Sequence, residues 1–233
     1  MRHLVAVLIT TACSQQVYSP PSRAFSLQPL AALPQGGRAL DLELSHHAQI
    51  FDPGINAGAA RLRVGVGDNI EVSAEGTALA VDDHGPSRAD RRLYAGRGGI
   101  SVTPGKGGLT LFAGLGGGYA PAGGAFAAAD AGISVGYHNC VLVPIVEASG
   151  FISNPLEPRP IDVTDDEYDT FDTPQRTVGG SVRAGLRLGL QRAACRRGAQ
   201  SSWLYAGFSF TSLADQDSSA GLLGVGVGLT IPL

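Results

Sequence analysis

The stretch Arg61–Gly76, RLRVGVGDNIEVSAEG, alternates between two kinds of side chain on both sides of Gly67-Asp68-Asn69. One set is apolar and comprises Leu62, Val64, Val66, Ile70, Val72 and Ala74. The other set is polar or small and comprises Arg61, Arg63, Gly65, Glu71, Ser73 and Glu75. Successive side chains of a strand point to opposite faces, so the pattern predicts a tight hairpin with one apolar and one polar face. The class of protein then depends on which of the two faces meets water.

The same two-residue period recurs along the chain, and no stretch has the period of a helix. Besides the hairpin, strands are expected near 39–47, 93–103, 109–119, 126–138, 141–151, 177–191, 201–211 and 220–233. The connections between them alternate between short and long. The sequence therefore predicts an all-β fold, an antiparallel up-and-down transmembrane β-barrel of about ten strands, with eight or twelve as alternatives. Short turns are expected on the periplasmic side and long loops outside.

Composition supports placing the apolar face outward. Charged residues are 16% of the chain and glycine occurs 33 times, so a water-exposed surface would carry few charges. Rows of leucine and valine suit lipid, while glycines and ion pairs suit a narrow lumen. The alternative is a soluble, lipocalin-like barrel with the leucine and valine rows lining a ligand cavity. The net charge of -3 gives no basic patch for nucleic acid. No apolar run reaches about 18 residues, so no transmembrane helix is expected.

The N-terminus has the layout of an export signal, with Arg2 and His3 before an apolar run and small residues. We expect a signal peptide over 1–12, a flexible periplasmic tether over 13–38 and a barrel over 39–233. Residues 10–13, Thr-Thr-Ala-Cys, resemble the lipobox of bacterial lipoproteins. That resemblance makes Cys13 a candidate lipidation site, the alternative being an ordinary signal with an incidental cysteine.

Charges on the inward faces of the predicted strands balance one another. Because charges withdrawn from water need partners, and arginine can bind carboxylates through two hydrogen bonds, we expect a lumen charge network. Its predicted members are Asp41, Glu43, Arg61, Arg63, Glu71, Glu75, Arg97, Asp130, Arg183 and Arg187. The alternative is a solvated outer face with exposed ion pairs.

Over about 39–233, the chain resembles the small outer-membrane β-barrel proteins of Gram-negative bacteria, the broad group of OmpA-like and OmpW-like barrels. The final alternation, residues 225–233, resembles the terminal strand signal read by barrel assembly machinery, although the chain ends in Leu233 after Pro232. The resemblance implies the outer membrane as location, and its lipid, lipopolysaccharide and the barrel assembly machinery as partners. Pro144 within a predicted strand suggests a bulge or a break there.

Aromatic residues near strand ends suggest two interfacial girdles. The expected loop-side residues are Tyr94, Tyr119, Phe126, Phe151, Phe208 and Phe210, and the turn-side residues are Tyr137 and Trp203.

Two further groups of residues are candidate sites. Cys140 and Cys195 fall in predicted turns on one side of the barrel and form a candidate disulfide, with two free thiols as the alternative. The longest loop concentrates carboxylates that form a candidate cation-binding loop, although its spacing does not fit an EF-hand and a solvated acidic loop is the plainer interpretation. These carboxylates are Asp162, Asp165, Asp166, Glu167, Asp169 and Asp172.

Nothing in the sequence has the spacing of a catalytic or metal motif, and no cofactor is expected. His46, His47, Asp82, Asp83 and His84 are the residues that an enzymatic interpretation would use, but adjacent histidines on a strand point to opposite faces. We therefore predict a non-enzymatic envelope component or narrow pore. The alternative is a surface interaction or adhesion barrel that acts through its acidic loop toward an unknown extracellular partner.

Overall fold

The computed structural model describes residues 19–23, 27–48, 54–82, 92–105, 107–121, 123–137, 139, 141–162, 171–190, 201–216 and 219–233. Ten long strands form the fold. Their bounds are β1 Arg38–Ala48, β2 Gly54–Gly67, β3 Ile70–Asp82, β4 Arg92–Val102, β5 Leu109–Ala120, β6 Gly124–Gly136, β7 Leu142–Pro155, β10 Thr177–Gly189, β11 Trp203–Ala214 and β12 Ser219–Pro232. Across the described residues, no helix is long and apolar enough to cross a membrane.

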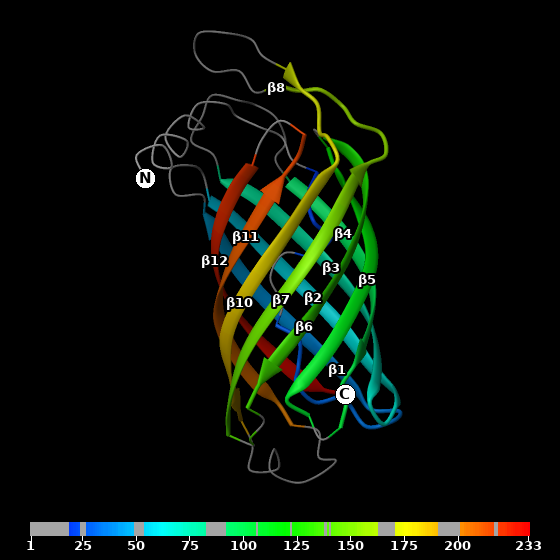
Figure 1. Ribbon diagram of the computed structural model, residues 1–233, viewed down its shortest axis with the longest axis vertical. Coiled ribbons are helices and arrows are strands. Elements are labelled where there is room, and N and C mark those ends of the chain that lie inside the picture. Colours follow the sequence, from blue (N-terminus) through cyan, green and yellow to red (C-terminus); the bar gives the residue numbers. More distant parts are fainter. Residues whose placement is uncertain are drawn as a thin grey trace, which may run out of the picture.

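Each strand pairs with its neighbour in the chain, and β1 pairs with β12 to close the ring. Every pairing is antiparallel, so the predicted ten-stranded, all-antiparallel barrel is confirmed. The closing pair, hereafter the seam, aligns Ala39 with Pro232 and Ala48 with Leu223. Figure 1 shows the strands tilted around the long axis of the barrel, which is the geometry that closure of a sheet requires.

The hairpin of β2 and β3 shows which face of the sheet is on the outside of the barrel. Val66 and Val72 are 48% and 40% exposed on the outside of the barrel, while Arg61 and Glu71 are only 2% and 3% exposed inside it. β10 and β12 follow the same rule, with Val182 and Val227 among their exposed residues. The leucine and valine rows therefore do not line a ligand cavity, as the lipocalin-like alternative required, because they form the outer surface.

The two ends of the barrel differ. The turn of Asp68 and Asn69 lies at one end, hereafter the turn end, and there the backbone N–H of Leu233 donates to the carbonyl of Arg38 at 3.0 Å. Residues 190–202 join β10 to β11 at the turn end, whereas the other end, hereafter the loop end, holds the longest connection, residues 156–176, and those of residues 49–53, 83–91, 121–123 and 215–218 (Figure 1). The longest of them contains a small hairpin in which β8, Ile161–Asp162, pairs with β9, Phe171–Asp172.

Pro144 neither breaks nor bulges β7, so that expectation is wrong. β7 pairs with β10 without a register shift, with Pro144 opposite Leu186. On its other side the pairing with β6 ends one residue later, at Ile145 opposite Gly136. No residue of β6 pairs with Pro144, so the absence of an N–H on the proline removes no hydrogen bond between β6 and β7.

The aromatic girdles are only partly present. Tyr94, Tyr119, Tyr137, Phe208 and Phe210 are exposed on the outside. Phe126 is buried instead, and Trp203 packs against the buried cluster that includes Val143 and Ile145. These two rings lie on inward positions of the strand alternation, where they help to fill the lumen.

Candidate functional site

The lumen contains the N-terminal segment of the chain, which is the largest departure from the sequence prediction. Residues 19–23 and 27–37, hereafter the plug, were expected to be part of a flexible tether. Ser19, Ser22, Arg23 and Leu27 are buried in the structure, and side chains of five barrel strands bond to the plug's main chain or side chains. The tether prediction is wrong for these residues because the lumen supplies partners that a local sequence pattern does not reveal.

Most of these contacts hold the main chain of the plug rather than its side chains. Arg61 donates to the carbonyl of Leu27 at 3.2 Å, and Thr110 donates to the carbonyl of Pro29 at 2.9 Å. The backbone N–H of Gln28 donates to Glu147 at 2.9 Å, and that of Leu33 donates to Glu71 at 2.7 Å. An extended, proline-containing segment cannot satisfy its own backbone groups, so the wall of the barrel does so.

Apolar contacts fix the turn-end half of the plug. Leu27 and Leu30 form one buried cluster with Val143, Ile145 and Tyr205. Val143 and Ile145 are inward-facing residues of β7, at a place where a polar lumen would be expected. The plug explains them, because its two leucines supply the apolar surface against which they pack.

The ten residues of the predicted lumen charge network all carry side chains that are buried inside the barrel. Many lie in two rows that cross neighbouring strands. The first row runs Thr230, Asp41, Arg61, Glu75, Arg97 across β12, β1, β2, β3 and β4. Opposite charges on facing positions of adjacent strands attract one another, so this row alternates in sign along the wall.

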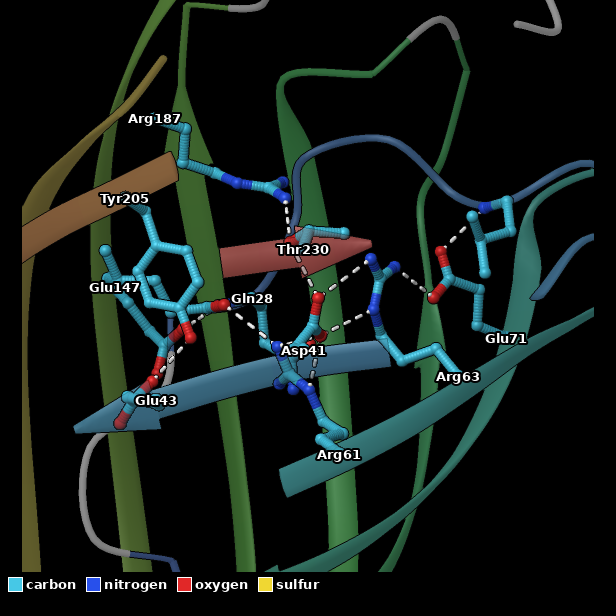
Figure 2. A network of polar contacts seen from close by, with 12 residues as sticks. Gln28, Asp41, Glu43, Arg61, Arg63, Glu71, Glu147, Arg187, Tyr205 and Thr230 are labelled. Carbon is cyan, nitrogen blue, oxygen red and sulfur yellow. Dashed lines mark hydrogen bonds and ion pairs between the residues drawn. The ribbon is translucent and has the colours of Figure 1, made fainter. Parts of the chain in front are cut away.

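Asp41 lies in the first row between Thr230 and Arg61, as Figure 2 shows. It accepts from Arg61 Nε at 2.9 Å and from Arg63 Nε at 2.8 Å. Thr230 of β12 donates its hydroxyl to the same carboxylate at 2.7 Å, and Arg187 in turn donates to Thr230 at 3.0 Å. Asp41 thus links β2 to β12 across β1, at the seam.

Two other carboxylates complete this side of the lumen. Arg63 donates to Glu71 at 2.8 Å, so Arg63 bridges Asp41 and Glu71. The hydroxyl of Tyr205 donates to Glu43 at 2.7 Å, as Figure 2 shows. Gly228 faces this tyrosine, and a Cβ at Gly228 would overlap the ring. A glycine on the inner face of β12 therefore makes room for the phenol.

Arg97 and Asp130 form a pair of their own. Arg97 donates through Nε at 2.6 Å and through Nη2 at 2.7 Å, which is the two-bond geometry of a guanidinium on a carboxylate. A Cβ at Gly114 would overlap the Arg97 guanidinium, so the glycine lets Arg97 lie across β5. Within the described residues, the Glu75 carboxylate has no hydrogen-bond partner, because its facing residues Arg61 and Arg97 bond to Asp41 and Asp130.

The second row runs Ser134, Glu147, Arg183 across β6, β7 and β10. Its central residue, Glu147, was missed by the sequence analysis. It is fully buried and faces Arg183 on β10 and Ser134 on β6. Arg183 donates to Glu147 at 2.6 Å and Ser134 at 2.9 Å. From the plug come Arg23 Nη1, at 3.1 Å, and the N–H of Gln28. The strand alternation contained this signal, but the apolar Val143 and Ile145 on the same face concealed it.

Arg23 is the second charged residue that the sequence analysis missed. Its guanidinium bonds to Glu147 and lies 4.8 Å from the centroid of the Phe112 ring. With Arg23 and Glu147 included, the described lumen holds six arginines and six carboxylates, so its formal charges cancel. The arginines are Arg23, Arg61, Arg63, Arg97, Arg183 and Arg187, and the carboxylates are Asp41, Glu43, Glu71, Glu75, Asp130 and Glu147.

The remaining predicted sites fall largely outside the described residues. These include Cys13, Cys140 and Cys195, and also Asp165, Asp166, Glu167 and Asp169 of the acidic loop. Asp162 and Asp172 lie in the strands of the β8–β9 hairpin. Among the residues that are described, no group of three or more histidine, cysteine, aspartate or glutamate side chains is arranged to hold a metal ion.

The two histidines of β1 point to opposite faces, as the strand alternation predicts. His46 is outside and its ring forms a 2.9 Å hydrogen bond with Asn56, whereas His47 is buried. They therefore do not share a site. Asp83 and His84 lie outside the described residues.

No protein-family model matches the chain, and no curated protein matches it. Several solved structures resemble its fold. The N-terminal β-barrel domain of Pseudomonas aeruginosa OprF is 10% identical with a TM-score of 0.35, covering 84% of this chain and 98% of that one. The β domain of the Bordetella autotransporter BrkA is 13% identical with a TM-score of 0.47, at the same coverages.

An outer membrane channel from Pseudomonas putida F1 is 9% identical with a TM-score of 0.46, covering 90% of this chain and 100% of that one. The structural neighbours are thus outer-membrane β-barrels of Gram-negative bacteria. At these identities and scores, no residue role or activity is carried over from them to this chain.

Proposed function

We propose that this protein is a non-enzymatic barrel of the Gram-negative outer membrane whose lumen is closed by its own N-terminal segment. The observation that carries the proposal is the reversed polarity of the wall. Exposed leucines and valines cover the outside, while the buried side chains of the same strands are mostly charged or hydroxylated. A barrel in water needs the opposite arrangement, whereas a barrel in lipid needs this one.

The interior supports a closed rather than an open barrel. The plug is bonded to the wall from Ser19, beside Thr177, to Gly36, beside Gly65. In the part of the chain that the structure describes, the lumen charges pair mostly with each other, so they form no ring of one sign such as lines an ion-selective pore. We therefore assign the resting protein a structural role in the envelope, with passage of solutes only when the plug leaves.

Membrane location is tested by fractionation and gel migration. The protein extracted from the outer-membrane fraction should migrate faster unboiled than boiled in SDS, because a closed barrel stays folded until it is heated. Recovery in a detergent-free soluble fraction, without a heat-dependent shift, would contradict the proposal.

Closure by the plug is tested in planar lipid bilayers. The hydroxyls of Ser19 and Ser153 are 2.8 Å apart, so Ser19→Cys with Ser153→Cys should give a disulfide that fixes the plug to β7. Cys140→Ser and Cys195→Ser form the background. We expect no steady conductance from the wild type or from the oxidised pair, and steady conductance from a variant that lacks residues 19–37. Equal conductance in all three would show that the plug does not close the lumen.

The double variant also separates a fixed plug from a mobile one. If openings seen in the wild type arise from departure of the plug, the oxidised pair abolishes them and a reductant restores them. Openings that persist in the oxidised pair must pass beside the plug. In every case the heat-dependent gel shift shows whether the variant has folded.

A further inference from the structure

The plug crosses the lumen in one direction, from the loop end to the turn end. At the loop end, the N–H of Ser19 donates to Thr177 at 2.9 Å, and Ser153 donates to the carbonyl of Pro20 at 2.7 Å. Thr177 is the first residue of β10 after the longest loop, and Ser153 is near the loop-side end of β7. These contacts fix the start of the plug beside the long loops.

The other end of the plug lies beside the tight turns. Leu30 accepts at its carbonyl from the N–H of Gly108, just before β5, at 3.2 Å. The N–H of Gly36 donates to the carbonyl of Gly65 at 2.8 Å, three residues before the Asp68 turn. The chain then enters β1 at Arg38 and runs back toward the loop end. It thus passes the barrel twice in opposite directions, once inside and once in the wall.

From this path we propose that the plug starts at the cell surface, with Ser19 at the loop end of the lumen and opposite the C-terminus. The inference rests on the proposed function for the placement of the barrel in the outer membrane. It also takes the orientation expected from the sequence, with the Asp68 turn on the periplasmic side. It replaces the periplasmic position that a tether would give to this part of the chain. An even number of strands would otherwise bring both chain ends to the same side, and the plug adds one more crossing.

The test is thiol labelling of intact cells with a membrane-impermeant polyethylene glycol maleimide, in a Cys140→Ser, Cys195→Ser background that keeps Cys13. Three single variants are compared with this background: Gln16→Cys before the plug, Glu157→Cys at the loop end and Asp68→Cys at the turn end. Glu157 and Asp68 are both exposed, so they are matched reporters of the two sides. Each labelled thiol adds one step in apparent mass on a gel.

We expect Gln16→Cys and Glu157→Cys each to gain one step in intact cells, and Asp68→Cys to gain it only after the outer membrane is permeabilised. If Glu157→Cys is labelled in intact cells but Gln16→Cys only after permeabilisation, the inference is overturned while the proposed barrel stands. If Asp68→Cys is labelled and Glu157→Cys protected, the proposed orientation fails and the inference fails with it. The heat-dependent gel shift confirms that each variant is folded.

Discussion

Asp41 and Glu147 are both buried carboxylates that accept hydrogen bonds from two arginines, but they join different parts of the molecule. All the side chains that donate to Asp41 belong to the wall, namely Arg61 and Arg63 on β2 and Thr230 on β12. Glu147 accepts from the wall through Arg183 and from the plug through Arg23. The first carboxylate therefore secures the seam, while the second secures the plug to the wall.

Because of this difference, closure of the barrel and retention of the plug can be tested by separate substitutions. A buried ion pair is weak support for stability by itself, because desolvation offsets the attraction, but removal of one partner leaves an uncompensated charge and is costly. Loss of Asp41 should act mainly on closure of the barrel. Loss of Glu147 should act mainly on retention of the plug.

The largest effect is expected from Asp41→Ala. It leaves Arg61 without its carboxylate and removes the link from β2 to β12, so we expect the free energy of unfolding to fall by about 3 to 5 kcal/mol. Urea titration of the detergent-solubilised protein, followed by the fluorescence of Trp203, the sole tryptophan, measures it. Asp68→Ala, which changes an exposed aspartate in the tight turn, is the control and should change little. Equal stability of the two variants would contradict a role of Asp41 at the seam.

A smaller loss of stability and a larger change in conductance are expected from Glu147→Gln. The amide can still accept from the N–H of Gln28 but no longer balances Arg23 and Arg183, so the contact should weaken by about 3 kcal/mol. In planar bilayers, openings should become far more frequent than in the wild type. Glu157→Gln, which changes an exposed loop-end residue, should leave them unchanged. A Glu147→Gln barrel as silent as the wild type would mean that the plug does not depend on this carboxylate.

The smallest effect is expected from Tyr205→Phe. The ring still packs against Leu27 and Leu30, and only the hydrogen bond to Glu43 is lost. We expect the free energy of unfolding to fall by about 1.5 kcal/mol with little change in conductance. Tyr137→Phe, at an exposed tyrosine, is the matched control. A rise in conductance as large as that of Glu147→Gln would place Tyr205 with the plug rather than with the wall.

The wall could be predicted from the sequence because strand alternation is a local property. The period of two residues predicts that Val66 is exposed and Arg63 is buried. In the same way it predicts the apolar outer face and the charged inner face. The plug could not be predicted in this way. Its segment has no period, and its partners are remote: Ser19 bonds to Thr177, 158 residues away in the chain. Its proline and glycine content is typical of a linker, and only the partners provided by the lumen distinguish it from one.

Glu147 lies between these two cases. Its position on the inner face follows from the alternation of β7, yet Val143 and Ile145 make that face look apolar. Their burial makes sense only once Leu27 and Leu30 are known to lie against them. Apolar residues on both faces of a barrel strand thus indicate that the inner face contacts another part of the protein, and not water. A charged residue on that inner face, such as Glu147, then marks a contact with the same part.

The plug also bears on how such a chain can reach its folded state. Folds seldom pass their own chain through a closed ring, and here the ring is closed by strands that start and end the barrel, with Asp41 and Thr230 189 residues apart in the chain. The plug directly precedes β1, so the first strands can gather around it before β12 arrives. Closing the ring around a segment already in the lumen avoids threading it afterwards. In the proposed orientation, folding of the barrel around the plug would also set Ser19 at the cell-surface end of the lumen.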